Sequence, residues 1–151
     1  MTPARNFQPV DPGFEKKVRD SFAQQGLMQH LGARMVSIGP GQCEIRLGYR
    51  EQLTQQHGYF HAGATSAIAD SACGYAAYSL MPEGASVLTV EFKINLLAPA
   101  EGEELVARGR VVRSGRTLKV CEADVFALKQ GEETHCALML ATVMGLPGRS
   151  G

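Results

Sequence analysis

Hydrophobic and polar residues alternate in two separate parts of the chain. Apolar residues occupy every second position over 43–49, and the same alternation returns over 90–96. A period of two predicts strands with one face buried. Three more strands are expected over 105–113, 117–128 and 134–144. The last has apolar residues at both odd and even positions, which predicts that both of its faces are covered.

Two segments have helical character instead. Phe14, Val18 and Phe22 recur at near-helical spacing, which predicts a short helix over about 12–25. In the segment 62–79, twelve of eighteen residues are Ala, Gly or Ser. Residues this small let another backbone approach closely, so we expect a long helix packed tightly inside the fold.

One long helix and five or six antiparallel strands predict an α+β fold, in which the sheet covers the helix nearly all round. A further strand is expected over 33–38, before a turn at 39–41, and the last four strands are expected to follow one another as a meander. The expected organisation is an N-terminal arm (1–12), one domain (13–146) and a flexible tail (147–151).

Charge and composition exclude several classes of function. Fifteen basic residues balance fifteen acidic ones, so no overall field favours nucleic acid or an anionic membrane as a partner. Neither a secretory signal nor an apolar run long enough to span a membrane is recognised. The four cysteines are scattered without a CxxC pair, which favours reduced thiols and a cytoplasmic location.

The acid of the central helix, Asp70, lies among alanines and serines. A carboxylate in such surroundings needs a partner or a task. The helix start near His61 offers free backbone N–H groups, which can stabilise developing negative charge. His61 and Asp70 are nine residues apart, which means about 13 Å and opposite sides of a helix. Two chains related by a two-fold axis can bring these groups together.

These residues resemble a known family. The chain is similar over about 30–145 to the hotdog-fold acyl-CoA thioesterases of the phenylacetate-pathway (PaaI-like) branch. The segment LTVEFKINLLAPAEGE, at 88–103, adds to the resemblance. The residues that match the family motif are Gln55, Gly58, His61, Ala62, Gly63, Ala69 and Asp70.

The resemblance implies a role for each matching residue. Asp70 corresponds to the catalytic carboxylate, acting as general base on water or as the nucleophile. The backbone N–H of Ala62 corresponds to the oxyanion donor, and Gln55 to an amide that polarises the thioester carbonyl. His61 is expected to organise the loop, and Thr89 matches a serine that holds the attacking water in some members.

The resemblance further implies an acyl-CoA substrate, no separate cofactor, and a dimer or a dimer of dimers. Gly58 and Gly63 fall in the substrate-binding loop. The phosphates of CoA need local cations in a neutral protein, and Lys93, Arg113 and Arg116 are the candidates. Two departures concern substrate fit: Ala62 replaces a glycine but keeps its N–H, and Gln55 is a methylene longer than the usual asparagine.

Three other interpretations stay open from the sequence. His57 and His61 have the spacing of half a zinc site, although no third ligand is evident. The same fold serves acyl-CoA-binding proteins without hydrolytic activity and enoyl-CoA hydratases or dehydratases. His30 and His135 have no predicted role, and Tyr75 is expected in the core or the acyl pocket.

Overall fold

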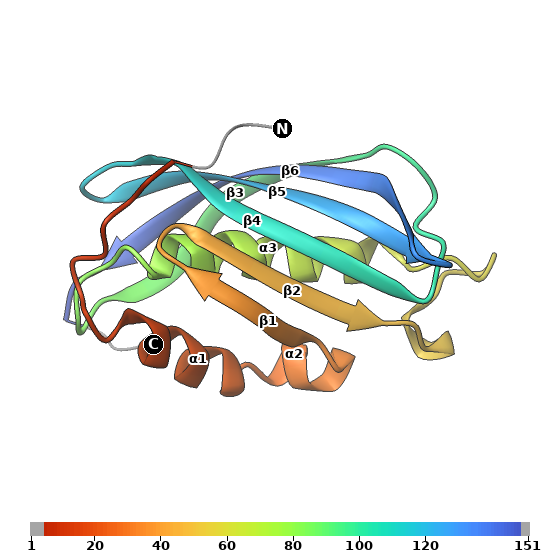
Figure 1. Ribbon diagram of the computed structural model, residues 1–151, viewed down its shortest axis with the longest axis horizontal. Helices are drawn as coiled ribbons and strands as arrows, with labels where there is room; N and C mark the ends of the chain where they lie inside the picture. Colours follow the sequence, from red (N-terminus) through yellow and green to blue (C-terminus); the bar gives the residue numbers. More distant parts are fainter. Residues whose placement is uncertain (1–4, 149–151) are drawn as a thin grey trace.

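A computed structural model describes residues 5–148 of the chain. Its elements follow one another as shown in Figure 1. In chain order they are α1 (Phe14–Ala23), α2 (Gly26–Leu31), β1 (Arg34–Gly39), β2 (Gln42–Gly48), a 3₁₀ turn (Glu51–Leu53), α3 (Ala62–Tyr78), β3 (Ser86–Leu96), β4 (Glu104–Ser114), β5 (Leu118–Lys129) and β6 (Glu132–Leu146).

The six strands form one antiparallel sheet in the order β1-β2-β4-β5-β6-β3. The sheet curves around α3, and α1 and α2 lie along its β1 edge (Figure 1). The predicted α+β hotdog arrangement is therefore confirmed. Within the described residues no helix is long and apolar enough to cross a membrane.

The predicted meander of the last four strands is wrong in one respect. Strands β4, β5 and β6 do follow one another, but β3 pairs with β6 and forms an edge of the sheet. The connection from β3 to β4, over 97–103, is too long for a tight hairpin. It carries the chain to the opposite part of the sheet, where β4 pairs with β2.

The N-terminal region also differs from the prediction. The single helix expected over 12–25 ends at Ala23, and the short helix α2 follows it. Gln25 breaks the run because its backbone is extended (ψ 107°), so Gly26 opens α2 instead of closing α1. The predicted arm and tail partly lie outside the described residues, at 1–4 and 149–151, and these boundaries stay predictions.

Small side chains let the sheet approach α3 closely, as expected. Eleven of the seventeen residues of α3 are buried. A Cβ added at Gly109 of β4 would lie 2.5 Å from the backbone carbonyl carbon of Ala72, so strand and helix backbones meet almost directly. Only residues without large side chains permit this contact.

One chain leaves the β3 side of the sheet uncovered. On β3, Val90 is 54% exposed, Phe92 46% and Leu96 58%. On β6, Leu138 and Leu140 are exposed as well, so only one face of that strand is covered within the chain and the predicted coverage of both faces is absent there. A long apolar edge strand is an obvious place for a second chain to pair.

Candidate active site

Asp70 lies half-buried in the middle of α3, facing β3. Its carboxylate oxygen Oδ1 accepts a hydrogen bond of 2.7 Å from the Thr89 hydroxyl. Both residues line a cavity of about 220 Å³, which we call the Asp70 cavity. The other residues of its lining are Gln25, Ser71, Gly74, Tyr75, Val87 and Leu88.

A β-bulge turns Thr89 toward Asp70. In the pairing of β3 with β6, Thr89 lies opposite Val143 and Glu91 opposite Thr142, so Val90 is an extra residue. Extending the alternation of 90–96 back by one residue predicts Thr89 on the same face as Glu91, and the structure shows that this is wrong. The bulge moves Thr89 to the face that looks at α3, a common use of bulges near functional sites.

The start of α3 leaves one backbone donor free. His61 is the N-cap, and its Nδ1 atom accepts a hydrogen bond of 2.7 Å from the Gly63 N–H. The next two N–H groups bond to the His61 carbonyl oxygen. For the Ala62 N–H, no acceptor is found among residues 5–148. This donor is therefore available to a ligand, at the positive end of the helix dipole.

The helix start also bears on the possible zinc site. His57 lies in the loop before α3, and His61 is occupied in capping the helix, so the two do not share a helix face. In the part of the chain that the structure describes, no group of three or more His, Cys, Asp or Glu residues is placed to hold a metal ion.

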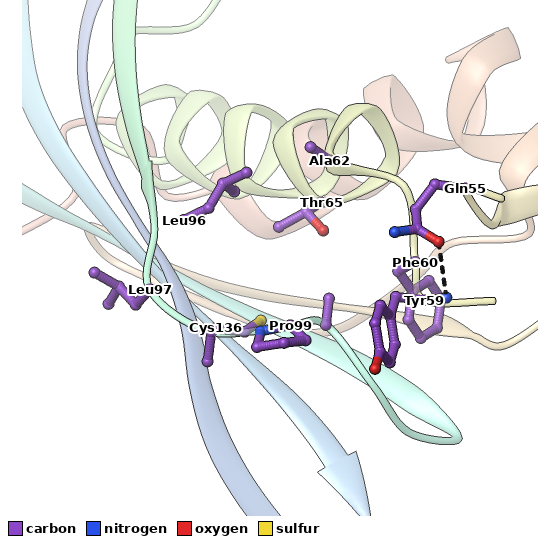
Figure 2. Close-up of a pocket in the computed structure, with 11 residues that line it drawn as sticks. Gln55, Tyr59, Phe60, Ala62, Thr65, Leu96, Leu97, Pro99 and Cys136 are labelled. Atoms are coloured by element: carbon purple, nitrogen blue, oxygen red, sulfur yellow. Dashed lines mark hydrogen bonds between the residues drawn. The ribbon is translucent and has the colours of Figure 1, made fainter. Parts of the chain in front are cut away.

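Hydrogen bonds within the loop before α3 fix the orientation of the Gln55 amide. Its Oε1 atom accepts from the N–H groups of His57 (2.5 Å) and Tyr59 (3.3 Å), the second of which is drawn in Figure 2. Gly58, with a positive φ of 85°, closes this turn by donating its N–H to the Gln55 carbonyl. Because the oxygen serves the loop, the Nε2 group of Gln55 points into the neighbouring cavity (Figure 2).

This second cavity, which we call the Ala62 cavity, has a volume of about 450 Å³. It lies between the start of α3, the loop before it and the segment after β3 (Figure 2). Its lining consists of Gln55, Tyr59, Phe60, Ala62, Thr65, Leu96, Leu97, Ala98, Pro99, Ala100 and Cys136. Burial raises the pKa of the Cys136 thiol to about 11, so this cysteine is a poor nucleophile at neutral pH.

A single chain divides the predicted active site into two parts. The Ala62 cavity holds Gln55 and Ala62, whereas the Asp70 cavity holds Asp70 and Thr89, and no residue lines both. Ala62 and Asp70 are separated by about 12 Å of helix rise. The structure therefore brings Thr89 to Asp70, and Gln55 to Ala62, but it does not join the two pairs within one chain.

The predicted phosphate-binding cations lie apart from both cavities. Lys93 pairs across the sheet with Leu140, and Arg113 with Val120, so both side chains share the outer face of the sheet. Arg116 lies in the exposed turn between β4 and β5. Among the described residues, none of the three forms an ion pair.

Sequence reasoning assigned Asp70, Thr89 and Tyr75 but missed the other residues of the Asp70 cavity, among them Gln25 and Gly74. Gln25 comes from the junction of α1 and α2, far from Asp70 in the sequence, and only the fold brings it there. Gly74 could have been found, because it follows Asp70 by four residues and so lies on the same side of the helix.

Replacing His61 with alanine is expected to destabilise the fold by about 1 kcal/mol, the usual effect of losing a side-chain N-cap. The His61 side chain is exposed, and the cap is its one hydrogen bond among residues 5–148, so the loss should report the cap alone. Urea denaturation measures this change. His57→Ala is the matched control, and equal losses for the two variants would contradict the capping role.

Comparisons with known proteins all point to thioesterases and esterases. Residues 57–134 match the family model of the thioesterase superfamily. A Halobacterium salinarum protein that carries the name esterase is 34% identical over 105 residues, which cover 66% of this chain and 69% of that protein. Human acyl-coenzyme A thioesterase 13 is 28% identical over 127 residues, covering 83% of this chain and 76% of that one. The crystal structure of a thioesterase family protein from Silicibacter pomeroyi superposes with a TM-score of 0.89 at 55% identity, over 90% of this chain and all of the other.

Proposed function

The chain belongs to the thioesterase superfamily and is a thioester hydrolase, and from this premise we propose that it hydrolyses acyl-CoA at sites shared by two chains. The similarity to human acyl-coenzyme A thioesterase 13 supports acyl-CoA as the substrate class. In this proposal one chain supplies Asp70 and Thr89, and its partner supplies Gln55 and Ala62.

The division of the site into two cavities is the observation that carries the proposal. A carboxylate and an oxyanion donor must lie within a few ångströms of the same carbonyl group to act on it. Within one chain the helix keeps Asp70 and the Ala62 N–H about 12 Å apart. A second chain, paired antiparallel along the open β3 edge, would set the start of its α3 against Asp70 of the first.

The apolar surface of β3 supports pairing at this edge. Val90, Phe92 and Leu96 are each about half exposed in a single chain. Phe92 and Leu96 lie opposite the buried residues Ala141 and Ala137, on the sheet face that carries the helix. A partner helix could cover this face, and the buried apolar area would stabilise the dimer.

The two parts of the shared site have separate tasks in thioester hydrolysis. Asp70 takes a proton from a water molecule, which Thr89 helps to position, and the water oxygen attacks the thioester carbonyl carbon. The negative charge that develops on the carbonyl oxygen is stabilised by the Ala62 N–H and the Gln55 Nε2 group of the partner chain. The intermediate collapses with cleavage of the C–S bond, and the proton held by Asp70 passes to the CoA sulfur.

Water is the simplest nucleophile for this site. Burial raises the pKa of the thiol groups of Cys73 and Cys136, which keeps them protonated at neutral pH. The sequence contains no GxSxG elbow for a nucleophilic serine. Asp70 itself is the alternative nucleophile, and it would then form a mixed anhydride with the acyl group.

For the CoA phosphates we propose Arg113, Arg116 and Lys93. Their support is that they are exposed and form no ion pair within residues 5–148, whereas Arg46, for example, is held by two glutamates. Unpaired cations are available to an anionic ligand without breaking an existing contact.

The test of the function is release of free CoA thiol from a panel of acyl-CoAs that covers short, medium, branched and aromatic acyl groups. We expect stoichiometric release of thiol and free acid from at least one class. Hydration of an enoyl-CoA without thiol release would instead support the hydratase alternative. Tight binding with no turnover of any substrate would support a binding protein, and either result would overturn the proposal.

A further inference from the structure

Thr65 is a buried polar residue of α3 whose hydroxyl group the fold does not use. The residue is only 2% exposed. The other buried polar or charged residues among 5–148 each form a side-chain hydrogen bond; they are Asp11, Ser71, Ser79, Lys119 and Asp124. For the Thr65 hydroxyl, no hydrogen-bond partner is found in this part of the chain. Burying a hydroxyl without a partner destabilises a fold, so this residue needs another reason.

The helix itself does not require threonine at position 65. A threonine hydroxyl inside a helix can bond to the carbonyl oxygen four residues earlier, which here is that of His61. That oxygen accepts the backbone N–H groups of Ala64 and Thr65 instead. The next residue, Ser66, does form the local bond, at 2.8 Å to the Ala62 carbonyl oxygen. Threonine is also a weaker helix former than alanine, so helix formation does not explain its presence.

The Thr65 side chain points into the Ala62 cavity. Thr65 lines this cavity together with Gln55 and Ala62, and its hydroxyl oxygen points toward the side on which the Gln55 Nε2 group lies (Figure 2). Because Thr65 follows Ala62 by three residues, it lies on the same side of the helix, about 4.5 Å further along the axis. Side chains of a helix tilt toward its N-terminus, which brings the hydroxyl back toward the Ala62 N–H.

Three hydrogen-bond donors are therefore free at one end of this cavity. The Gln55 Nε2 group and the Ala62 N–H, like the Thr65 hydroxyl, have no acceptor among residues 5–148. Most of the remaining lining is apolar and includes Phe60, Leu96, Leu97, Ala98 and Pro99. Hydrogen bonds are stronger in such surroundings than in water. A ligand atom that all three groups bind must be an acceptor, such as a carbonyl oxygen.

We propose that Thr65 is a catalytic residue whose hydroxyl donates to the thioester carbonyl oxygen, as a third oxyanion donor beside the Ala62 N–H and the Gln55 Nε2 group. The inference rests on the proposed function and adds a residue to that site. A ground-state carbonyl oxygen has two lone pairs, which two donors already occupy. The oxyanion formed by attack has a third lone pair, so the third donor is fully used only then. The hydroxyl therefore lowers the barrier more than it tightens substrate binding.

Thr65→Val tests this role, because valine has nearly the same shape and a similar helix propensity but no hydroxyl. We expect kcat for acyl-CoA hydrolysis to fall by about tenfold or more, while KM changes by less than about twofold. Thr65→Ser keeps a hydroxyl and should retain most of the wild-type kcat. Thiol release at varied concentrations of the acyl-CoA that the wild-type chain hydrolyses fastest measures both constants. Thr142→Val, the same substitution on β6 outside both cavities, is the matched control.

Thermal denaturation distinguishes a catalytic hydroxyl from a structural one. Because the Thr65 hydroxyl has no partner among residues 5–148, Thr65→Val should leave Tm unchanged or raise it. A lower Tm that accompanies the lower activity would show that the hydroxyl supports the fold, and it would overturn the inference. Thr65→Ala, which removes the hydroxyl without adding a methyl group, is the second variant and should lose the same factor in kcat.

The kinetic outcomes separate this inference from the proposed function. A Thr65→Val variant with the wild-type kcat would overturn the third donor and leave the function standing. A raised KM at unchanged kcat would mean that the hydroxyl binds substrate equally before and after attack, and this too would overturn the inference. If the wild-type chain releases no thiol from any acyl-CoA, the proposed function fails, and the role of Thr65 fails with it.

Discussion

Asp70→Asn is expected to reduce kcat for acyl-CoA hydrolysis by about 10²-fold or more, in the range of general-base effects. Asparagine has nearly the same shape and its amide oxygen can still accept the hydrogen bond from Thr89, so the cavity should keep its geometry. What the variant loses is the ability to take a proton from water. Thiol release at saturating substrate measures the effect, and thermal denaturation checks that the fold is intact.

The control for this variant is Asp20→Asn, which neutralises an exposed carboxylate on α1 whose one ion-pair partner among residues 5–148 is Lys16. It should hydrolyse substrate at the wild-type rate. If Asp70→Asn also retained full activity, Asp70 would have no part in the reaction, and the shared site would lose its base.

Labelled water tests whether Asp70 forms a covalent intermediate. If Asp70 is a general base, a single turnover in H₂¹⁸O places the label in the product acid and none in the protein. If Asp70 is the nucleophile, it forms a mixed anhydride with the acyl group, and water that attacks the Asp70 carboxyl carbon of this anhydride leaves an Asp70 oxygen in the acid and the label in the protein. Label in the peptide that contains Asp70, found by mass spectrometry, therefore identifies the nucleophilic route, whereas label in the acid alone fits the general base or attack at the acyl carbon of the anhydride.

Local sequence signals predicted most elements of this fold but not how the strands pair. The alternation in β2 predicted a strand and the small residues of α3 predicted a packed helix. Such patterns are readable because the spacing of residues on one face depends only on local backbone geometry. The pairing of β3 with β6 depends on how a seven-residue connection, 97–103, crosses the molecule, and no local pattern records this. Local patterns do not predict the short helix α2, because a glycine just past a helical pattern usually ends a helix, whereas Gly26 opens one.

For the candidate site too, local patterns predicted the residues of one element but not the contacts between elements. Asp70, His61 and Ala62 could be found from their spacing, because all three belong to one helix and its cap. The bulge at Val90 was invisible to the alternation pattern, and it reverses the face on which Thr89 lies. Gln25 reaches the cavity only through the packing of α1 and α2 against the rest of the fold, which requires the three-dimensional structure.

Ala62→Pro offers a way to remove the proposed oxyanion donor without disturbing the helix. Ala62 is the first residue of α3, the position at which proline is best tolerated. His61 has φ −65° and ψ 140°, an extended conformation that is compatible with a following proline. Losing the Ala62 N–H should reduce kcat by about 10²- to 10³-fold, as for other single oxyanion donors.

Mixing this variant with Asp70→Asn should restore activity that neither has alone. In a mixed dimer, one site combines Asp70 from one chain with the Ala62 N–H of the other and is intact, while the second site lacks both groups. Random assembly of equal amounts makes half of the dimers mixed, so activity should rise to about a quarter of the wild-type value. Co-refolding the two variants and measuring thiol release provides the test, with each variant refolded alone as the control. If each site lay within a single chain, every site in the mixture would carry one defect, and activity would not rise above that of the separate variants.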